Sequence, residues 1–441
     1  MKTVLLSFLY RFLAFCARIY IRRHSIYIIA ITGSVGKTSC RLIISEVLKQ
    51  VQESIPGEDT ETKEIFRIYT SPENYNSELG LVFSVFGVEK YHPSFVNLFK
   101  LSVKIFFQAL FGKKNTDILI AEYGIDAPRD MDKLLRVAVP DITVLTKLDA
   151  VHSGNFPGGV REYWAEKWKL LLKTPGKVYV NLQDSYSQEQ YYLLSDYIEI
   201  GDETEKNFDL IKDDEYTVKM KFYYKGKNIS LNLIGEDNMV YTKLGLDIAT
   251  DLGFELTEKG YDFNFKLQAG RFSFFKKGES IYIDSSYNAA PESVKLALKN
   301  TFLLQKKIFS DYKIITVLGD MRELGDISEE AHRDIAEHLY KTDAIYTVGP
   351  LMYEYLIPEL KNIKYKGSIT SSLSARDIGK KLKKYLKNNN TEKYLILFKG
   401  SQNTIYTEEA LAELLIKSEY KKLPRQSKAW KAKKEEFFRE V

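Results

Sequence analysis

The run at residues 28–39 constrains the fold more than any other part of this sequence, and it reads Ile-Ile-Ala-Ile-Thr-Gly-Ser-Val-Gly-Lys-Thr-Ser. An apolar stretch, 26–31, leads into it, and apolar residues at helical spacing follow over 42–48. A strand, a glycine loop and a helix in succession form the setting of a phosphate-binding loop, because the glycines let several backbone N–H groups point at one phosphate. The sequence therefore predicts a nucleotide-binding loop on a parallel α/β sheet.

Two side chains at the end of this loop support the same interpretation. Lys37 offers a cation to the outer phosphates, and Thr38 offers a hydroxyl to Mg²⁺. The general pattern has a further glycine where this chain has Ile31, so the loop is a shortened variant. The alternative is an ordinary glycine turn before a helix. We expect these residues to bind ATP: Gly33, Ser34, Val35, Gly36, Lys37, Thr38 and Ser39.

Composition narrows the class of protein. The chain has 441 residues, of which 44% are hydrophobic and 28% charged, as in a folded protein of two or three domains. Its only cysteines, Cys16 and Cys40, cannot form a disulfide framework, which favours the reducing cytoplasm. A net charge of +5 is too small to indicate nucleic-acid binding by itself, and we expect no such partner.

Two segments are both apolar and basic. The first 20 residues place apolar side chains at helical spacing with Arg11 and Arg18 on the other face, which predicts an amphipathic helix and not a signal peptide. An insertion at 88–116 carries Lys100 and Lys104 on one helical stripe. Neither segment reaches the about 18 apolar residues that span a bilayer. Two interpretations stay open: weak peripheral binding to the inner membrane face, or packing on the nucleotide-binding domain.

Alternation of strand and helix patterns gives the domain organisation. Apolar strands at 118–121, 142–145 and 178–180 each end in polar residues, where ligand sites lie in parallel sheets. Residues 216–234 predict a β-hairpin, and a second α/β pattern begins near Gly270. We predict an amphipathic helix at 1–25, a central ATP-binding domain with a parallel sheet at 26–264, a Rossmann-like α/β domain at 265–418, and a basic tail at 419–441.

Further polar segments follow in a fixed order, at 70–76, 121–124, 152–156, 164–167, 284–291, 318–325 and 399–401. Together with the phosphate loop they resemble the Mur ligase family, the ATP-dependent amide ligases of peptidoglycan precursor synthesis, from about residue 27 to about residue 415. Two of them read Tyr-Asn-Ala-Ala-Pro and Leu-Gly-Asp-Met-Arg-Glu-Leu-Gly. These resemble the branch that adds D-alanyl-D-alanine to a UDP-muramoyl tripeptide.

The resemblance implies a reaction. A substrate carboxylate attacks the γ-phosphate of ATP, an acyl phosphate forms, and an amine then displaces phosphate to make the amide. Concentrating positive charge around the phosphates is what such a transfer requires. The implied partners are a nucleotide-sugar peptide and a dipeptide, acted on by a cytoplasmic monomer in cell-wall synthesis. ATP contacts implied for both domains suggest that the domains close during turnover.

The resemblance also implies residue roles. Catalysis would rest on Lys37, Glu122, His152, Lys167 and Arg271. Magnesium would be held by Thr38, Glu122, His152 and Lys167, the last carbamylated by CO₂ so that it becomes an anion. Further nucleotide contacts would come from Asn238, Arg271, Asp284 and Asn288, and substrate contacts from Asn74, Asn76, Asp320 and Glu323.

Each role has a structural alternative. Glu122 reads equally as a solvated strand-end carboxylate, His152 as a loop histidine, and Lys167 as a surface lysine. Arg271 reads as an interdomain salt bridge, and both Asp320 and Glu323 as helix caps.

Two departures from the family pattern, the short N-terminal segment and the insertion at 88–116, leave the function open. Only about 30 residues precede the phosphate loop, so we expect the UDP-sugar-binding domain of the D-alanyl-D-alanine-adding branch to be lacking. This favours a second interpretation, a ligase for another carboxylate such as a poly-glutamate or a lipid-linked precursor. A third is an NTPase scaffold that binds ATP and partners without ligation, and the intact set of polar residues speaks against it.

Overall fold

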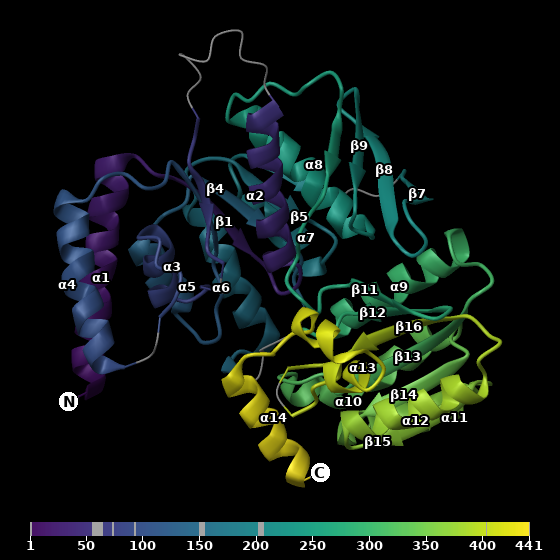
Figure 1. Cartoon of the computed structure of the whole chain (residues 1–441). Coiled ribbons are helices and arrows are strands. Elements are labelled where there is room, and N and C mark those ends of the chain that lie inside the picture. Colours follow the sequence, from purple (N-terminus) through teal and green to yellow (C-terminus); the bar gives the residue numbers. More distant parts are fainter. Residues whose placement is uncertain are drawn as a thin grey trace. The chain divides into compact units, whose positions relative to one another are not determined.

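A computed structural model describes residues 2–54, 65–72, 75–91, 94–149, 155–201, 207–402 and 404–440. The chain divides into two compact units (Figure 1). The first unit comprises Met1–Asn207, Tyr223–Ile229 and Glu236–Phe265, and the second Phe208–Phe222, Ser230–Gly235 and Lys266–Val441.

The first unit is built on a six-stranded parallel sheet of order β2-β3-β1-β4-β5-β6. Its strands are fully or largely buried at the centre, as expected for a parallel sheet covered on both faces. The strands predicted at 118–121, 142–145 and 178–180 are confirmed. The bounds are β1 Tyr27–Thr32, β2 Ile68–Thr70, β3 Ile118–Glu122, β4 Ile142–Leu145, β5 Val178–Asn181 and β6 Tyr197–Ile200.

Helices cover this sheet. Alternate residues of the central strands, Ile28 and Ala30 among them, share one apolar cluster with several of these helices. The helices of the unit are α1 Lys2–His24, α2 Lys37–Ser54, α3 Glu78–Val85, α4 Phe95–Phe111, α5 Asp130–Val137, α6 Gly159–Lys173, α7 Ser185–Gln190 and α8 Glu236–Asp251.

Helix α1 is part of the first unit, and not a separate appendage. Its residues Leu13, Cys16, Ala17 and Tyr20 are almost completely buried in the apolar cluster. The Tyr20 hydroxyl donates a hydrogen bond to the carbonyl of Lys113 at 2.8 Å, so the end of α1 is tied to the segment after α4. The packing interpretation is therefore confirmed for one face of α1. Within the residues that the structure describes, no helix is long and apolar enough to cross a bilayer.

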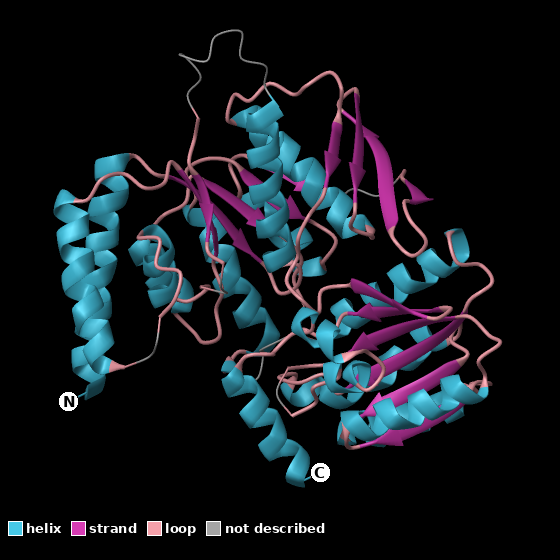
Figure 2. Ribbon diagram, in the orientation of Figure 1, coloured by secondary structure: helices cyan, strands magenta, loops and turns pink. Residues whose placement is uncertain are grey.

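The second unit contains a six-stranded mixed sheet of order β11-β12-β16-β13-β14-β15, in which only the pairing of β11 with β12 is antiparallel. Figure 2 shows helices on both sides of it. The strands are β11 Ser273–Lys277, β12 Ser280–Asp284, β13 Lys313–Gly319, β14 Ala344–Val348, β15 Ser368–Ser372 and β16 Tyr394–Lys399. The helices are α9 Pro291–Lys307, α10 Ser328–Asp334, α11 Ile357–Asn362, α12 Ala375–Asn388, α13 Glu408–Ala412 and α14 Lys428–Glu440.

A third, four-stranded sheet has the order β10-β9-β8-β7, with β7 Asp209–Lys212, β8 Val218–Tyr224, β9 Lys227–Leu231 and β10 Tyr261–Phe263. The hairpin predicted at 216–234 is β8 and β9. Lys225 and Gly226 connect them with φ values of 48° and 75°, the positive values of a two-residue hairpin turn.

The residues expected to form a basic tail fold onto the second unit. Lys434 on α14 is 2% exposed, and its ammonium lies 2.6 Å from the Glu409 carboxylate. The Tyr406 ring packs 5.5 Å from that of Phe437. The sequence of this segment did not predict these contacts, because it is rich in charged residues and its contact partners lie elsewhere in the chain.

Burial of one face of α1 predicts a specific stability effect. Leu13→Ala leaves a cavity in the cluster and should lower the free energy of unfolding by about 3 kcal/mol. The matched control Phe8→Ala, on the same helix but 71% exposed, should change it by under about 0.5 kcal/mol. Denaturant titration measures both, and equal effects would contradict the placement of α1.

Candidate functional site

The phosphate loop lies between β1 and α2, as predicted. Gly33 and Gly36 adopt φ values of 141° and 89°, which other residues rarely tolerate. A Cβ at Gly33 would lie 2.1 Å from the Thr146 hydroxyl oxygen, and one at Gly36 would lie 2.1 Å from the Tyr241 hydroxyl. Both positions therefore require glycine, and the resulting cradle of backbone at a helix N-terminus fits a phosphate group.

The segment after β4 holds this loop in place. The Ser34 amide donates to the carbonyl of Lys147 at 2.7 Å, and the Ser34 hydroxyl donates to the carbonyl of Asp149 at 2.9 Å. The Lys37 ammonium donates to the carbonyls of Gly33, at 2.7 Å, and Ser34, at 3.2 Å. Hydrogen bonds within the protein therefore hold the loop and the Lys37 side chain in place without a ligand.

Glu122 ends β3 beside the loop and is paired with a residue that our sequence interpretation missed. The Arg41 Nε–H donates to Glu122 Oε1 at 2.9 Å, and the two side chains are 2% and 4% exposed. Arg41 also donates to the Thr70 hydroxyl at 2.7 Å and to the Ser71 carbonyl. This buried arginine joins the carboxyl ends of β2 and β3 to helix α2. The alternative of a solvated carboxylate at Glu122 is wrong.

Lys167 on α6 is 1% exposed, so the alternative of a surface lysine is also wrong. Its ammonium nitrogen lies 4.5 Å from the centre of the Tyr163 ring. Burial lowers the pKa of the Lys167 amine well below its usual value, and the nearby positive charge of Lys37 lowers it further. Tyr163 in turn hydrogen-bonds the Ser34 side chain. The structure therefore brings Lys167 to the phosphate loop as a buried amine with a lowered pKa.

The remaining predicted residues of the first unit are placed less tightly. The carbonyl of Asn76 accepts a hydrogen bond from the Gly124 amide at 2.9 Å, two residues beyond Glu122. Asn238 lies in the first turn of α8, and Thr38 and Ser39 lie in the first turn of α2. His152 and Asn74 lie outside the described residues.

The second unit gathers four of the predicted or quoted residues at the carboxyl ends of β12 and β16. Asp284 is fully buried, its Oδ1 accepts from the Ser286 amide at 3.0 Å, and burial raises the pKa of its carboxyl to about 6. Lys399 donates to the Asn288 carbonyl. Burial, with the positive charge of Arg271 adding to it, lowers the pKa of Lys399 to about 7.

Arg271 and the loop after β12 are supported from the supposed tail. The Arg271 guanidinium lies 4.3 Å from the centre of the Tyr287 ring. Arg425 donates to the carbonyls of Ser286, at 2.7 Å, and Tyr287, at 2.9 Å. A residue that we had placed in a basic tail therefore holds the loop that carries Asn288.

Asp320 and Glu323 differ from each other. Asp320 is fully buried, and its Oδ1 accepts from the Met352 amide at 2.8 Å, at the start of the helical segment after β14. This is the helix-capping alternative. Glu323 is exposed, with a φ of 67°.

Three functional candidates, Arg41, Tyr163 and Arg425, were missed in the sequence. For the first two a signal existed: Arg41 lies four residues after Lys37 and Tyr163 four before Lys167, so each pair shares a helix face. Arg425 had no local signal.

The donor set fits magnesium. The Thr38 hydroxyl and the Glu122 carboxylate offer oxygen atoms, the ligand type that Mg²⁺ prefers. Among the described residues, no three histidine, cysteine, aspartate or glutamate side chains gather into a metal-binding group. A complete magnesium site there would need further oxygen donors, such as the phosphates of a nucleotide or a modified side chain.

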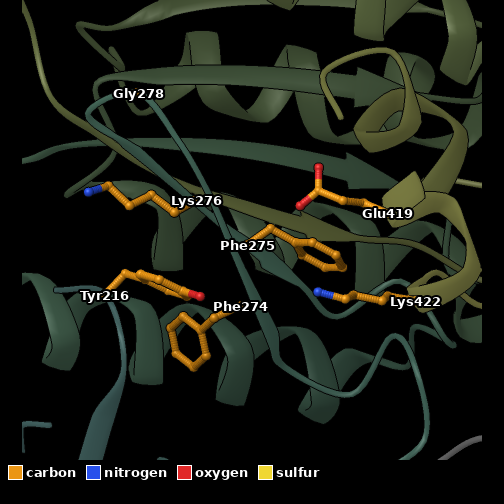
Figure 3. A pocket seen from close by; sticks show the side chains of 7 residues that line it. All are labelled: Tyr216, Phe274, Phe275, Lys276, Gly278, Glu419 and Lys422. Carbon is orange, nitrogen blue, oxygen red and sulfur yellow. The ribbon is translucent and has the colours of Figure 1, made fainter. Parts of the chain in front are cut away.

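A pocket of about 380 Å³ on the second unit lies apart from the predicted residues (Figure 3). It is lined by Tyr216, Phe274, Phe275, Lys276, Gly278, Glu419 and Lys422. None of them is a predicted site residue, and we assign the pocket no function.

Comparison with known proteins places these features in a family. The model of the Mur ligase middle domain matches residues 31–241, and that of the Mur ligase glutamate ligase domain matches residues 270–402. The UDP-N-acetylmuramoyl-tripeptide–D-alanyl-D-alanine ligase of Bacillus subtilis is 26% identical over 415 residues, covering 90% of this chain and 78% of that protein. The ligase of the same name from Borreliella burgdorferi is 25% identical over 348 residues, covering 76% of this chain and 64% of that protein.

A solved structure shows the same fold. The MurF ligase of Thermotoga maritima in complex with ADP superposes with a TM-score of 0.68 at 22% identity, covering 91% of this chain and 82% of that one.

The buried pair of Arg41 and Glu122 predicts a non-additive stability effect. Arg41→Met leaves the Glu122 carboxylate buried without its counter-ion and should lower the free energy of unfolding by about 3–5 kcal/mol. The double variant Arg41→Met/Glu122→Leu removes both charges and should recover most of this loss. Denaturant titration of the two single variants and the double variant tests the pairing, and strictly additive effects would contradict it.

Proposed function

Because the chain belongs to the Mur ligase family, we propose that it is an ATP-dependent ligase that joins a carboxylate to an amine through an acyl phosphate. Its substrates are a UDP-muramoyl tripeptide and D-alanyl-D-alanine, as the names of the relatives suggest. It works as a cytoplasmic monomer in peptidoglycan precursor synthesis. The observation that carries the proposal is that Lys167 and Glu122 both lie beside the phosphate loop. A protein that only bound a nucleotide would need neither of these two side chains there.

Phosphate transfer to a carboxylate brings two anions together, and the first unit supplies the opposing charge. The loop amides and Lys37 would hold the phosphates of ATP, and a magnesium ion bound there would neutralise the charge that develops on them. Thr38, Glu122 and His152 are the proposed ligands of that ion. Arg41 is a positioning residue, since its hydrogen bond fixes Oε1 of Glu122.

Lys167 is proposed to act as a carbamate. A neutral amine attacks CO₂, forms an N–C bond and releases a proton, and burial favours this neutral form because it lowers the pKa of the Lys167 amine. The resulting anion would lie near the Lys37 ammonium, which would stabilise it. The modification turns a side chain that would repel the metal into one that supports it.

The second unit is proposed to contact nucleotide and amine. Arg271, Asp284 and Asn288 are the proposed nucleotide contacts of the second unit, and Asn238 is a proposed nucleotide contact of the first unit. Asn74, Asn76 and Glu323 are proposed substrate contacts, and Asp320 would act indirectly through the helix that it caps.

Loss of the loop cation should abolish ligation. Lys37→Ala should lower the rate of amide formation at least 10²-fold, because the variant loses a charge that stabilises the transferring phosphoryl group. The control Lys49→Ala, farther along α2, should retain full activity. Product mass after incubation with ATP, nucleotide precursors and a panel of amines is the readout. Amide formation with another carboxylate or amine would change the proposed substrates, and undiminished turnover of Lys37→Ala would refute the ligase itself.

Lys167→Ala should be inactive and should regain part of its activity when short carboxylic acids such as formate or acetate are added, since they restore the missing anion. Lys173→Ala, an exposed lysine on the same helix, serves as the control. Protein equilibrated with ¹³CO₂ should show a carbamate carbon signal by ¹³C NMR that Lys167→Ala lacks. A fully active Lys167→Ala, or an unchanged carbamate signal, would exclude this role.

A further inference from the structure

Helix α4 has two apolar faces, and only one of them is buried. Leu98, Ile105 and Ala109 are at most 3% exposed and pack into the first unit. The opposite face carries large apolar side chains in contact with solvent. Their exposed fractions are 59% for Val96, 59% for Phe99, 44% for Val103, 55% for Phe107 and 74% for Phe111. These residues recur at spacings of three, four and seven, so they form one continuous stripe along the helix.

Helix α1 extends this stripe. Figure 1 shows α1 and α4 side by side, and the rings of Phe12 and Phe106 stack between them at 5.8 Å. Beyond that contact, Phe8 and Phe15 on α1 are 71% and 52% exposed. We call the exposed residues of both helices, Phe8 and Phe15 with the five on α4, the α1–α4 face. An aromatic and aliphatic surface of this kind on a folded protein marks a docking site.

Cations border the α1–α4 face on both sides. Lys100 and Lys104 lie on the edge of the α4 stripe, and Arg11, Arg18 and Arg22 lie on the corresponding edge of α1. All five side chains are exposed. Neither helix contains an aspartate or a glutamate, so no acidic residue on these helices offsets the positive charge. An apolar strip flanked by lysine and arginine is complementary to a bilayer surface with anionic headgroups, since the rings enter the acyl region while the cations stay among the headgroups.

We infer that the α1–α4 face binds the surface of a membrane that contains anionic lipids, with both helix axes lying along that surface. On this inference the two interpretations left open by the sequence are compatible, because each concerns a different face of the same helices. A protein partner or a second copy of this chain would find apolar surface there but would need an acidic complement to the cations. A bilayer with anionic lipids supplies both the apolar region and the negative charge along the whole length of the two helices. Membrane binding by this face requires neither nucleotide nor turnover, so it can be tested independently of the ligase activity.

Flotation of the full-length protein with lipid vesicles tests the inference. Vesicles of phosphatidylcholine with phosphatidylglycerol should carry the protein at low ionic strength, and those of phosphatidylcholine alone should carry at least tenfold less. Added salt should release it, because screening weakens the attraction of the cations. Phe107→Ser/Phe111→Ser should weaken partition at least tenfold through lost apolar burial. Lys100→Gln/Lys104→Gln should weaken it about fivefold per charge and reduce the salt dependence.

The control Tyr192→Ser removes an aromatic ring that is 70% exposed elsewhere on the first unit, and it should float like the unmodified protein. All variants alter exposed side chains, and unchanged circular dichroism confirms that they fold. Failure of the unmodified protein to float at low ionic strength would overturn the inference, as would equal flotation of the two-phenylalanine variant. Light scattering that shows a dimer lost in that variant, without flotation, would instead assign the face to a contact between copies.

Discussion

The parallel pairing of β1 with β3 and β4 is the constraint on which the candidate site depends. Parallel neighbours end at the same edge of a sheet, so the phosphate loop after β1 is bordered by Glu122 on one side and Lys147 on the other. The Lys147 carbonyl accepts a hydrogen bond from the loop amide of Ser34. Glu122 pairs with Arg41 on α2, the helix that follows the loop. Strand order thus determines which groups face a bound phosphate.

Two basic side chains, Arg41 and Lys167, are buried close to the phosphate loop. Arg41 is paired with the Glu122 carboxylate. Burial lowers the pKa of the Lys167 amine, the charge of Lys37 lowers it further, and the charge of Asp126 opposes this shift. A carbamate on Lys167 would place a negative charge where the unmodified side chain carries an amine. Burial therefore disfavours the charged form of the unmodified lysine, whereas the proposed function requires a charged, modified one.

The sequence predicted those parts of the fold that are specified locally. The phosphate loop, the strands that end at Glu122 and Asn181 and the hairpin turn at Lys225 and Gly226 all depend on neighbouring residues in the chain. Contacts between distant segments were not predictable in the same way. Arg425 supports the loop after β12 from more than a hundred residues away, and its own surroundings in the sequence look like a charged tail.

The α1 and α4 helices show a different limit of sequence patterns. Hydrophobic periodicity predicts one apolar stripe on a helix and one surface that covers it. Helix α4, however, carries apolar side chains on two opposite faces. The sequence therefore presented packing and membrane binding as rivals. Only exposure values show that Ile105 is buried while Phe111, six residues on, faces solvent.

Isotope transfer tests the central claim most directly. The carboxylate substrate is labelled with ¹⁸O and incubated with ATP, magnesium, D-alanyl-D-alanine and the protein, and the inorganic phosphate is analysed by mass spectrometry. An acyl phosphate intermediate must leave one carboxylate oxygen on the phosphate, so the account predicts one ¹⁸O per phosphate released and one amide formed for each. Release of unlabelled phosphate, whether or not an amide forms, would contradict it.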